Sequence, residues 1–123
     1  MTLSNLSLLY FYEARFPEAK TLAERALVIQ EKALGPDDLD VALTLNRLGI
    51  ALRDLNNLPA AESALKRALA IREKHLPPDH PFLTISLENL ASVYIKQGRL
   101  ADARSLLDRS ALIRAKNNAA NSL

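Results

Sequence analysis

A period of 42 residues runs through the sequence and constrains its fold more than any other feature. Leucine recurs at this step, and alanine, arginine and isoleucine recur at other positions of the same period: Leu3, Leu45 and Leu87; Leu6, Leu48 and Leu90; Ala19, Ala61 and Ala103; Arg25, Arg67 and Arg109; Ile29, Ile71 and Ile113. A fixed period of this length is typical of stacked repeats, because one unit cannot bury its own apolar face and must pack against a neighbour. Such proteins usually present surfaces rather than perform reactions.

Each period predicts two helices. Apolar residues recur at helical spacing, and the turns fall at Phe16-Pro17, Gly35-Pro36, Leu58-Pro59, Pro77-Pro78 and Gly98. Asp37 or Asp38, and later Asp79, are placed to cap the helices that follow. We therefore expect six helices in an all-α solenoid, paired as 2–14 with 17–34, 38–56 with 59–76, and 80–97 with 101–116. Residues 117–123 are predicted to be a frayed tail.

Composition narrows the class of protein. The chain has 123 residues, which favours one domain, 1–123, with repeats at about 3–44, 45–86 and 87–116. It has no cysteine, which excludes disulfides and thiolate metal sites. The net charge of +2 argues against a nucleic-acid binder, and no apolar run is long enough to span a membrane. The start lacks the features of a secretory signal, so the expected location is cytoplasmic.

Charge is distributed unevenly along the chain. Residues 1–42 carry a net charge of −3, residues 43–84 carry +2 and residues 85–123 carry +3. This polarity could favour head-to-tail contacts between copies. The alternative interpretation is a chance scatter of solvated surface charge.

The residues of the second unit carry a family resemblance. Leu45-x-x-Leu48-Gly49-x-x-Leu52, followed by Ala61-x-x-x-Leu65 and Ala68, resembles the tetratricopeptide repeat (TPR). The first and third units match it in turn with Leu3, Leu6, Ser7, Tyr10, Ala19 and Ala23, and with Leu87, Leu90, Ala91, Tyr94, Ala103 and Leu107. The small residues let two helix backbones approach closely, and the larger ones fill the space between adjacent pairs. The resemblance implies a right-handed superhelix of three helix pairs.

The length and the residues of the repeats narrow this resemblance to one subclass. The 42-residue period exceeds the usual 34, and segments such as RALVIQEKALGPDD and RALAIREKHLPPDHP are similar to the kinesin light chain subclass of the repeat. The longer period implies about one extra turn in each helix. Two places depart from the pattern: Asp38-Leu39-Asp40 replaces the sequence found at His80-Pro81, and Arg109-Ser110-Ala111 interrupts the RAL motif.

No constellation of catalytic or metal-binding residues can be assembled. His75 and His80 flank a proline-rich turn, where capping explains them better than a metal site with too few ligands. The acidic loop at Asp37, Asp38 and Asp40 lacks the glycine and the distal glutamate of a calcium loop. We therefore predict no enzymatic activity, no metal and no cofactor.

The arginines at Arg25, Arg67 and Arg109 recur on the second helix of each pair, which the resemblance places on the outer surface. Acidic residues lie nearby in the sequence. We interpret this ladder as a salt-bridged outer face that contributes little to stability.

The resemblance places the first helix of each pair on a concave surface, where helix geometry predicts a peptide-binding groove. Its apolar members would anchor an extended peptide and its polar members would bind the peptide's backbone and charges. Alternatively, Leu8, Phe11 and Ile95 pack against neighbouring helices. The predicted groove residues are Ser4, Leu8, Phe11, Tyr12, Asn46, Arg47, Ile50, Arg53, Glu88, Asn89, Ser92, Ile95 and Lys96.

Two ligand types known for the family can be compared with these residues. A clamp for a chaperone's C-terminal carboxylate needs Lys and Asn where this chain has Ser4 and Leu8, which argues against that clamp. The kinesin light chain groove favours an aromatic anchor among acidic residues, and the resemblance implies that Arg47, Arg53 and Lys96 would meet the acidic ones.

The sequence therefore predicts a non-catalytic scaffold that binds a protein or peptide ligand, and neither nucleic acid nor membrane. The alternative is self-association of a fragment of a longer array. No polar capping helix follows the third unit, and Leu106, Leu107, Leu112 and Ile113 on the last helix would partly face solvent. A homo-oligomer through that helix is the corresponding prediction.

Overall fold

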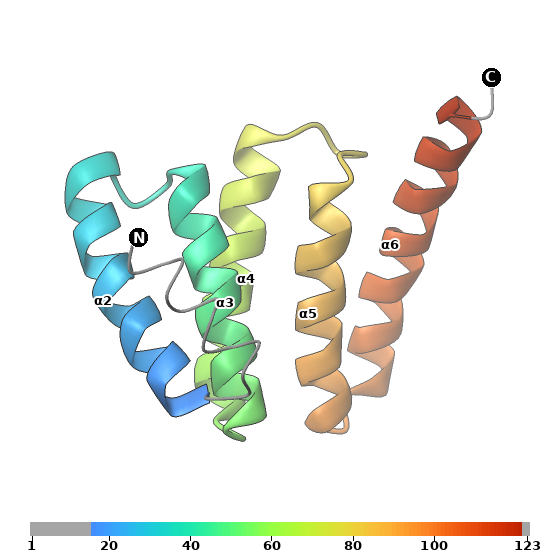
Figure 1. The fold of residues 1–123 in the computed structure, drawn as a ribbon. Helices are drawn as coiled ribbons and strands as arrows, with labels where there is room; N and C mark the ends of the chain where they lie inside the picture. The colour runs from blue at the N-terminus through green and yellow to red at the C-terminus, as the bar shows by residue number, and fades with distance from the viewer. Residues whose placement is uncertain (1–15, 122–123) are drawn as a thin grey trace.

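The computed structural model describes residues 16–121, and within this range the chain forms five α-helices and no strand. They are α2 (Phe16–Leu34), α3 (Leu39–Asp54), α4 (Leu58–His75), α5 (Phe82–Lys96) and α6 (Leu100–Asn121). Consecutive helices run antiparallel and stand side by side across the molecule (Figure 1). The sixth expected helix, 2–14, lies outside the described residues.

Short turns with special backbone conformations separate the helices. Asn56 and Gly98 stand one period apart, and both adopt positive φ values, 65° and 77°, in the turns that precede α4 and α6. Glycine and asparagine tolerate this left-handed region best. Asp38 caps α3 as predicted, since its Oδ1 accepts from the Asp40 amide at 2.8 Å. Pro59 occupies the first turn of α4, where its missing N–H costs nothing.

The predicted cap of α5 at Asp79 is wrong. The Phe82 amide instead donates to His80 Nδ1 at 3.0 Å, and Pro81 is the residue that precedes the helix. Because the helix begins after Pro81, His80 is one residue nearer in the chain than Asp79 to the first free amides.

The last helix also extends further than expected, to Asn121, although we predicted a frayed tail from residue 117. The Asn117 amide donates to the Asp79 carbonyl at 2.9 Å and so attaches the end of α6 to the loop before α5. One period earlier, His75 Nε2 donates to the Asp37 carbonyl at 2.7 Å. We call these two hydrogen bonds the helix-end clasps.

The core follows the 42-residue period. Leucines that recur in the sequence are buried between helices, and the small residues of the repeat are buried where two backbones meet: Leu45, Leu48, Leu87, Leu90, Ala19, Ala61, Ala91 and Ala103. Each helix packs on the next in the chain, and α3 also contacts α5. Stacking therefore brings the first helices of two units together on one side of the molecule.

Candidate functional site

Helices α3 and α5 share an incompletely buried surface, which we call the α3–α5 face. It is formed by residues at steps of three or four along each helix, which align on one side. The residues are Leu43, Arg47, Ile50 and Asp54 on α3, and Ile85, Asn89, Ser92 and Lys96 on α5. The two sets stand one period apart, so each position on α3 has its counterpart on α5.

Several predicted groove residues lie on or beside this face and contact one another. The Arg53 guanidinium bonds the Asp54 carboxylate at 3.0 Å and donates to Ser92 Oγ at 2.9 Å, which links α3 to α5. Lys96 Nζ lies 4.0 Å from the same carboxylate. Asp54 thus neutralises much of the positive charge that Arg53 and Lys96 bring to this end of the face.

The predicted groove residues differ in their exposure. On α3, Arg47 and Ile50 are half-buried; on α5, Asn89 is half-buried, and Ile95 and Lys96 are exposed. The predicted residues of the first unit, Ser4, Leu8, Phe11 and Tyr12, lie outside the described residues.

Asn46 is not available to a ligand in the way we predicted. It is 4% exposed, and its Nδ2 donates to Ser86 Oγ at 3.3 Å, between α3 and α5. Its Oδ1 is buried without a hydrogen-bond partner. The face runs through Arg47 instead, about 100° further around the helix.

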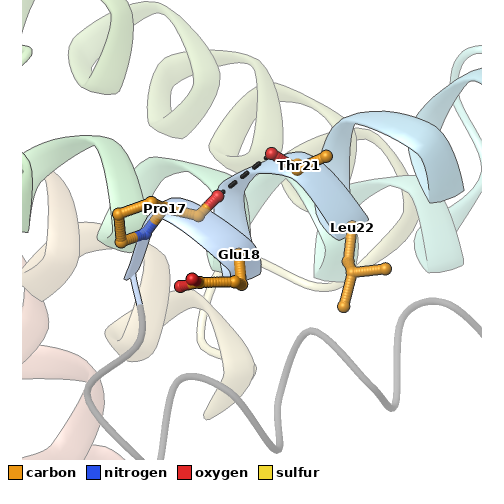
Figure 2. A pocket seen from close by; sticks show the side chains of 4 residues that line it. All are labelled: Pro17, Glu18, Thr21 and Leu22. Carbon is orange, nitrogen blue, oxygen red and sulfur yellow. Dashed lines mark hydrogen bonds between the residues drawn. The ribbon is translucent and has the colours of Figure 1, made fainter.

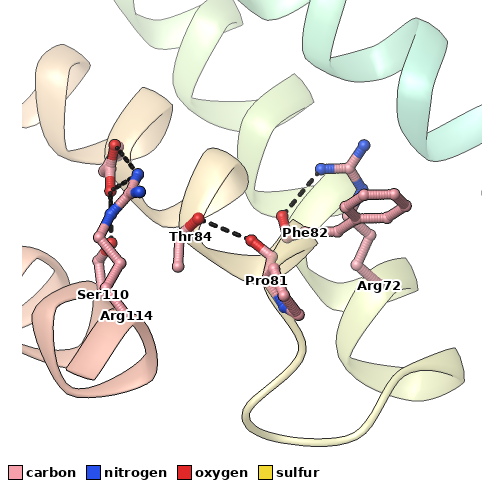
Figure 3. Close-up of polar contacts among 7 residues, drawn as sticks. Arg72, Pro81, Phe82, Thr84, Ser110 and Arg114 are labelled. Atoms are coloured by element: carbon pink, nitrogen blue, oxygen red, sulfur yellow. Dashed lines mark hydrogen bonds and ion pairs between the residues drawn. The ribbon is translucent and has the colours of Figure 1, made fainter. Parts of the chain in front are cut away.

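The Glu88 side chain also takes part in the packing of helices and not in the α3–α5 face. Its carboxylate accepts from Ser110 Oγ and forms a two-pronged ion pair with Arg114, both on α6 (Figure 3). The Ser110 hydrogen bond, more than the Arg114 charge, lowers the pKa of Glu88 below its ordinary value, although burial opposes this shift. Glu88 therefore stays ionised and holds α5 to α6.

A recess that we did not predict lies at the amino-terminal end of the face. It has a volume of about 340 Å³ and joins α3, the end of α4 and the start of α5; we call it the Arg72 recess. Its apolar lining includes several exposed large side chains, an uncommon arrangement on a folded surface. The lining residues are Leu39, Asp40, Leu43, Arg72, Leu76, Phe82 and Ile85.

Arg72 is buried, with 7% of its surface exposed. Its Nη1 donates to the Phe82 carbonyl and to Ser86 Oγ, both at 3.1 Å, and its guanidinium carbon lies 5.8 Å from the centre of the Phe82 ring (Figure 3). Within residues 16–121, no carboxylate lies within ion-pair distance of it. Burial lowers the pKa of Arg72, because desolvation disfavours its charged form.

Two residues of the sequence point to this recess but were not among the predicted groove residues. Leu43 and Ile85 stand one period apart and continue each helical stripe by one more turn toward its start. What the sequence could not show is that Arg72, on the second helix of its pair, reaches this side of the molecule.

A further recess lies along the start of α2 and is lined by Pro17, Glu18, Thr21 and Leu22 (Figure 2). Thr21 Oγ1 donates back to the Pro17 carbonyl at 3.1 Å, so its hydroxyl is already used within the helix. All four residues come from one helix, and we assign this recess no role.

The arginine ladder forms ion pairs between successive units. Arg67 on α4 bonds Glu31 on α2 at 3.0 Å, and one period later Arg109 on α6 bonds Glu73 on α4 at 2.8 Å. Both pairs are partly exposed. The salt-bridged outer face that we predicted is therefore present at these two steps, while Arg25, the first member, is exposed on α2.

The described residues also bear on two other kinds of site. No group of three or more His, Cys, Asp or Glu side chains there could hold a metal ion. None of the helices from α2 to α6 has the length and apolar character needed to cross a membrane.

Comparisons with known proteins agree with the repeated geometry. A family model described as tetratricopeptide repeat matches residues 1–74, and a second of the same description matches residues 84–121. Among curated proteins, none matches the sequence.

Two solved structures resemble the chain closely. BtubC (BKLC) from P. vanneervenii has a TM-score of 0.83 and 28% sequence identity, over 94% of this chain and 46% of that one. A Podosopora anserina protein described as a kinesin light chain with nearly identical TPR-like repeats has a TM-score of 0.85 and 27% identity, over 94% of this chain and 55% of that one. The chain thus spans about half the length of these structures.

Proposed function

Because the chain belongs to the tetratricopeptide repeat family, in its kinesin light chain-like subclass, we propose that it is a non-catalytic scaffold that binds a protein partner. The partner contributes an extended peptide, which lies along the concave side formed by the first helix of each pair. The proposal includes the right-handed superhelix of six helices and a cytoplasmic location.

One observation carries the proposal of a peptide groove: the Arg72 recess and the α3–α5 face are continuous through Leu43 and Ile85. The recess offers apolar side chains that solvent reaches, and the face beyond it offers polar side chains such as the amide of Asn89. Apolar anchor sites next to a few polar groups are what the side chains and backbone of an extended peptide require.

The groove residues of the proposal differ from those expected from sequence. Asn46 and Glu88 support the packing, and the recess residues replace them as apolar anchor sites. We retain the exposed and half-buried members on the two helices, together with the four positions of the first unit: Ser4, Leu8, Phe11, Tyr12, Arg47, Ile50, Arg53, Asn89, Ser92, Ile95 and Lys96.

A displayed library of random peptides tests the proposal. We expect the full chain to enrich a family of related peptides, and we expect Leu43→Asp with Ile85→Asp to abolish their binding. The matched control is Val28→Asp, which changes an exposed aliphatic residue on α2. Enrichment of no peptide, or equal binding by the groove variant and wild type, would show that the groove is not the binding site.

A second role, self-association through α6, is favoured by one observation. Leu107 is 39% exposed, although its counterpart one period earlier, Leu65, is fully buried. Leu100 and Leu112 on the same helix are also exposed, whereas Ile113 is buried and Leu106 is half-buried against the core. We propose that α6 pairs with another copy of the chain through Leu107 and Leu112.

A further inference from the structure

Three residues one period apart, Gln30, Arg72 and Arg114, occupy the same position on the second helix of each unit. The first two contact a hydroxyl on the first helix of the next unit. Gln30 Oε1 accepts from Thr44 Oγ1 at 2.6 Å, and Arg72 Nη1 donates to Ser86 Oγ at 3.1 Å; Thr44 and Ser86 are themselves one period apart. The junctions between units are therefore built alike, but with different charges.

The charge state differs from one member of this series to the next. Gln30 is neutral. Arg114 is a cation whose guanidinium is neutralised by the Glu88 carboxylate at 2.7 Å. Arg72 is a cation that is buried and has no carboxylate within ion-pair distance among the described residues. Burying an unpaired charge is costly, so Arg72 differs from Gln30 and Arg114 in needing an anion.

We propose that Arg72 determines the specificity of the groove: it selects a peptide whose acidic side chain enters the Arg72 recess, and it fixes the register of that peptide along the array. The inference rests on the proposed function, since it concerns the same groove. The occupant is a peptide segment with a carboxylate next to an apolar side chain.

The geometry of Arg72 suits this role. Phe82 and Ser86 hold one terminal nitrogen, Nη1, and Figure 3 shows the other terminal nitrogen directed away from the Phe82 carbonyl. The remaining donors, Nε and Nη2, form the edge that a carboxylate binds with two parallel hydrogen bonds. The apolar lining of the recess strengthens such a pair by excluding water. In the proposed complex, Leu39, Leu43 and Ile85 contact the apolar side chain of the peptide that stands next to its carboxylate.

Two neighbours modulate the site. Ser86 also accepts from Asn46, so a buried chain of hydrogen bonds from α3 through α5 to α4 fixes the position of the Arg72 guanidinium. Asp40 lines the recess with an exposed carboxylate, which opposes an incoming anion. Neutralising Asp40 should therefore strengthen the binding of a carboxylate.

The cations that the family resemblance suggests for acidic recognition are less suited to it. Arg53 and Lys96 already share the Asp54 carboxylate. A ligand carboxylate there would compete with Asp54, whereas at Arg72 none of the acidic groups between residues 16 and 121 is in ion-pair contact to compete with it.

Two fragments of equal shape test the proposal on the full chain: 3-phenylpropionate, which carries a carboxylate, and 3-phenylpropanamide, which carries a neutral amide. Binding is followed by shifts of backbone amide NMR signals. We expect the wild type to bind the carboxylate about tenfold more tightly than the amide, the effect of one charge-assisted hydrogen-bonded pair. Arg72→Gln, which copies the residue at Gln30, should remove this preference.

Arg114→Gln is the matched control, since it removes the equivalent cation one period later and should leave the preference unchanged. If Arg72→Gln does not fold, Asp40→Asn decides the matter: carboxylate binding should tighten about threefold, the effect of removing one exposed like charge, and unchanged affinity would overturn the proposal. A preference that survives Arg72→Gln would also overturn it. Library peptides that bind the groove without enrichment of acidic residues would refute the role of Arg72 while leaving the proposed function intact.

Discussion

Gly49 on α3 lies so close to Leu65 on α4 that a Cβ added to it would come within 2.4 Å of Leu65 Cγ. Real Cβ atoms do not approach a branched carbon this closely, so the two helices reach their separation only because this position has no side chain. One period later the same pair is Ala91 and Leu107. Leu107 is partly exposed there, so it is less confined than Leu65.

Gly49→Ala should therefore destabilise the fold by about 1–3 kcal/mol, although alanine is the better helix former. Chemical unfolding followed by circular dichroism measures this. The double variant Gly49→Ala with Leu65→Ala should lose less stability than the two single variants lose when their losses are added, because the clash disappears with the leucine. Strictly additive losses would mean that the helices move apart without cost.

The stability of the α5–α6 junction should depend on pH through Glu88. Its pKa is lowered from the ordinary 4.5, so its contribution is fully present above that value and is lost as the pH falls through the lowered pKa. We expect Ser110→Ala to cost about 1 kcal/mol at pH 7, a modest figure because Glu88 is partly solvated. Thermal melts across pH should show this cost shrinking in acid. A cost that is constant with pH would assign the effect of Ser110 to packing alone.

The ion pairs of the arginine ladder should contribute little. Arg109→Gln removes one exposed pair with Glu73, and we expect a loss of less than about 1 kcal/mol that high salt abolishes. Arg67→Gln should cost more, because Arg67 also donates to the Pro36 carbonyl at 3.0 Å. Unfolding at low and high salt separates the two contributions, since salt weakens the ion pair more than the hydrogen bond to the neutral carbonyl. Equal losses for both variants would argue against a role for Pro36.

Self-association through α6 should depend on concentration. Sedimentation of the wild type over a wide range should show a dimer or larger species, and Leu107→Glu with Leu112→Glu should shift the distribution to monomer, because each buried apolar side chain contributes about 1.5–3 kcal/mol. Val28→Glu with Ile29→Glu serves as a control that adds the same two charges on exposed residues of α2. A wild type that stays monomeric at the highest concentration would contradict the role of α6.

Much of the described fold was predictable because the repeat places the helix breaks. The helices expected at 17–34, 38–56, 59–76 and 80–97 match α2 to α5 within about two residues at each end. The last helix was predicted too short, because the clasp at Asn117 involves the backbone of Asp79. A hydrogen bond to a distant carbonyl leaves no pattern in the sequence.

The site was harder to predict than the fold. Helix periodicity identifies a stripe only to within one residue, and one residue is about 100° of rotation, which is why Asn46 is buried while Arg47 lies on the face. Arg72 was missed for another reason. The sequence pattern predicts that an arginine on the second helix of a pair lies on the surface. Only the packing of α5 against α4 shows that Arg72 is buried.

The helix-end clasps have a consequence for how such chains evolve. Each clasp joins a loop to a helix end 38 residues later, and each step of the arginine ladder spans 36, so both lie within adjoining units and recur with the period. A gene duplication that inserted one whole unit would reproduce both contacts at the new boundary without further mutation. A protein built in this way can change the number of its units while keeping the contacts between them.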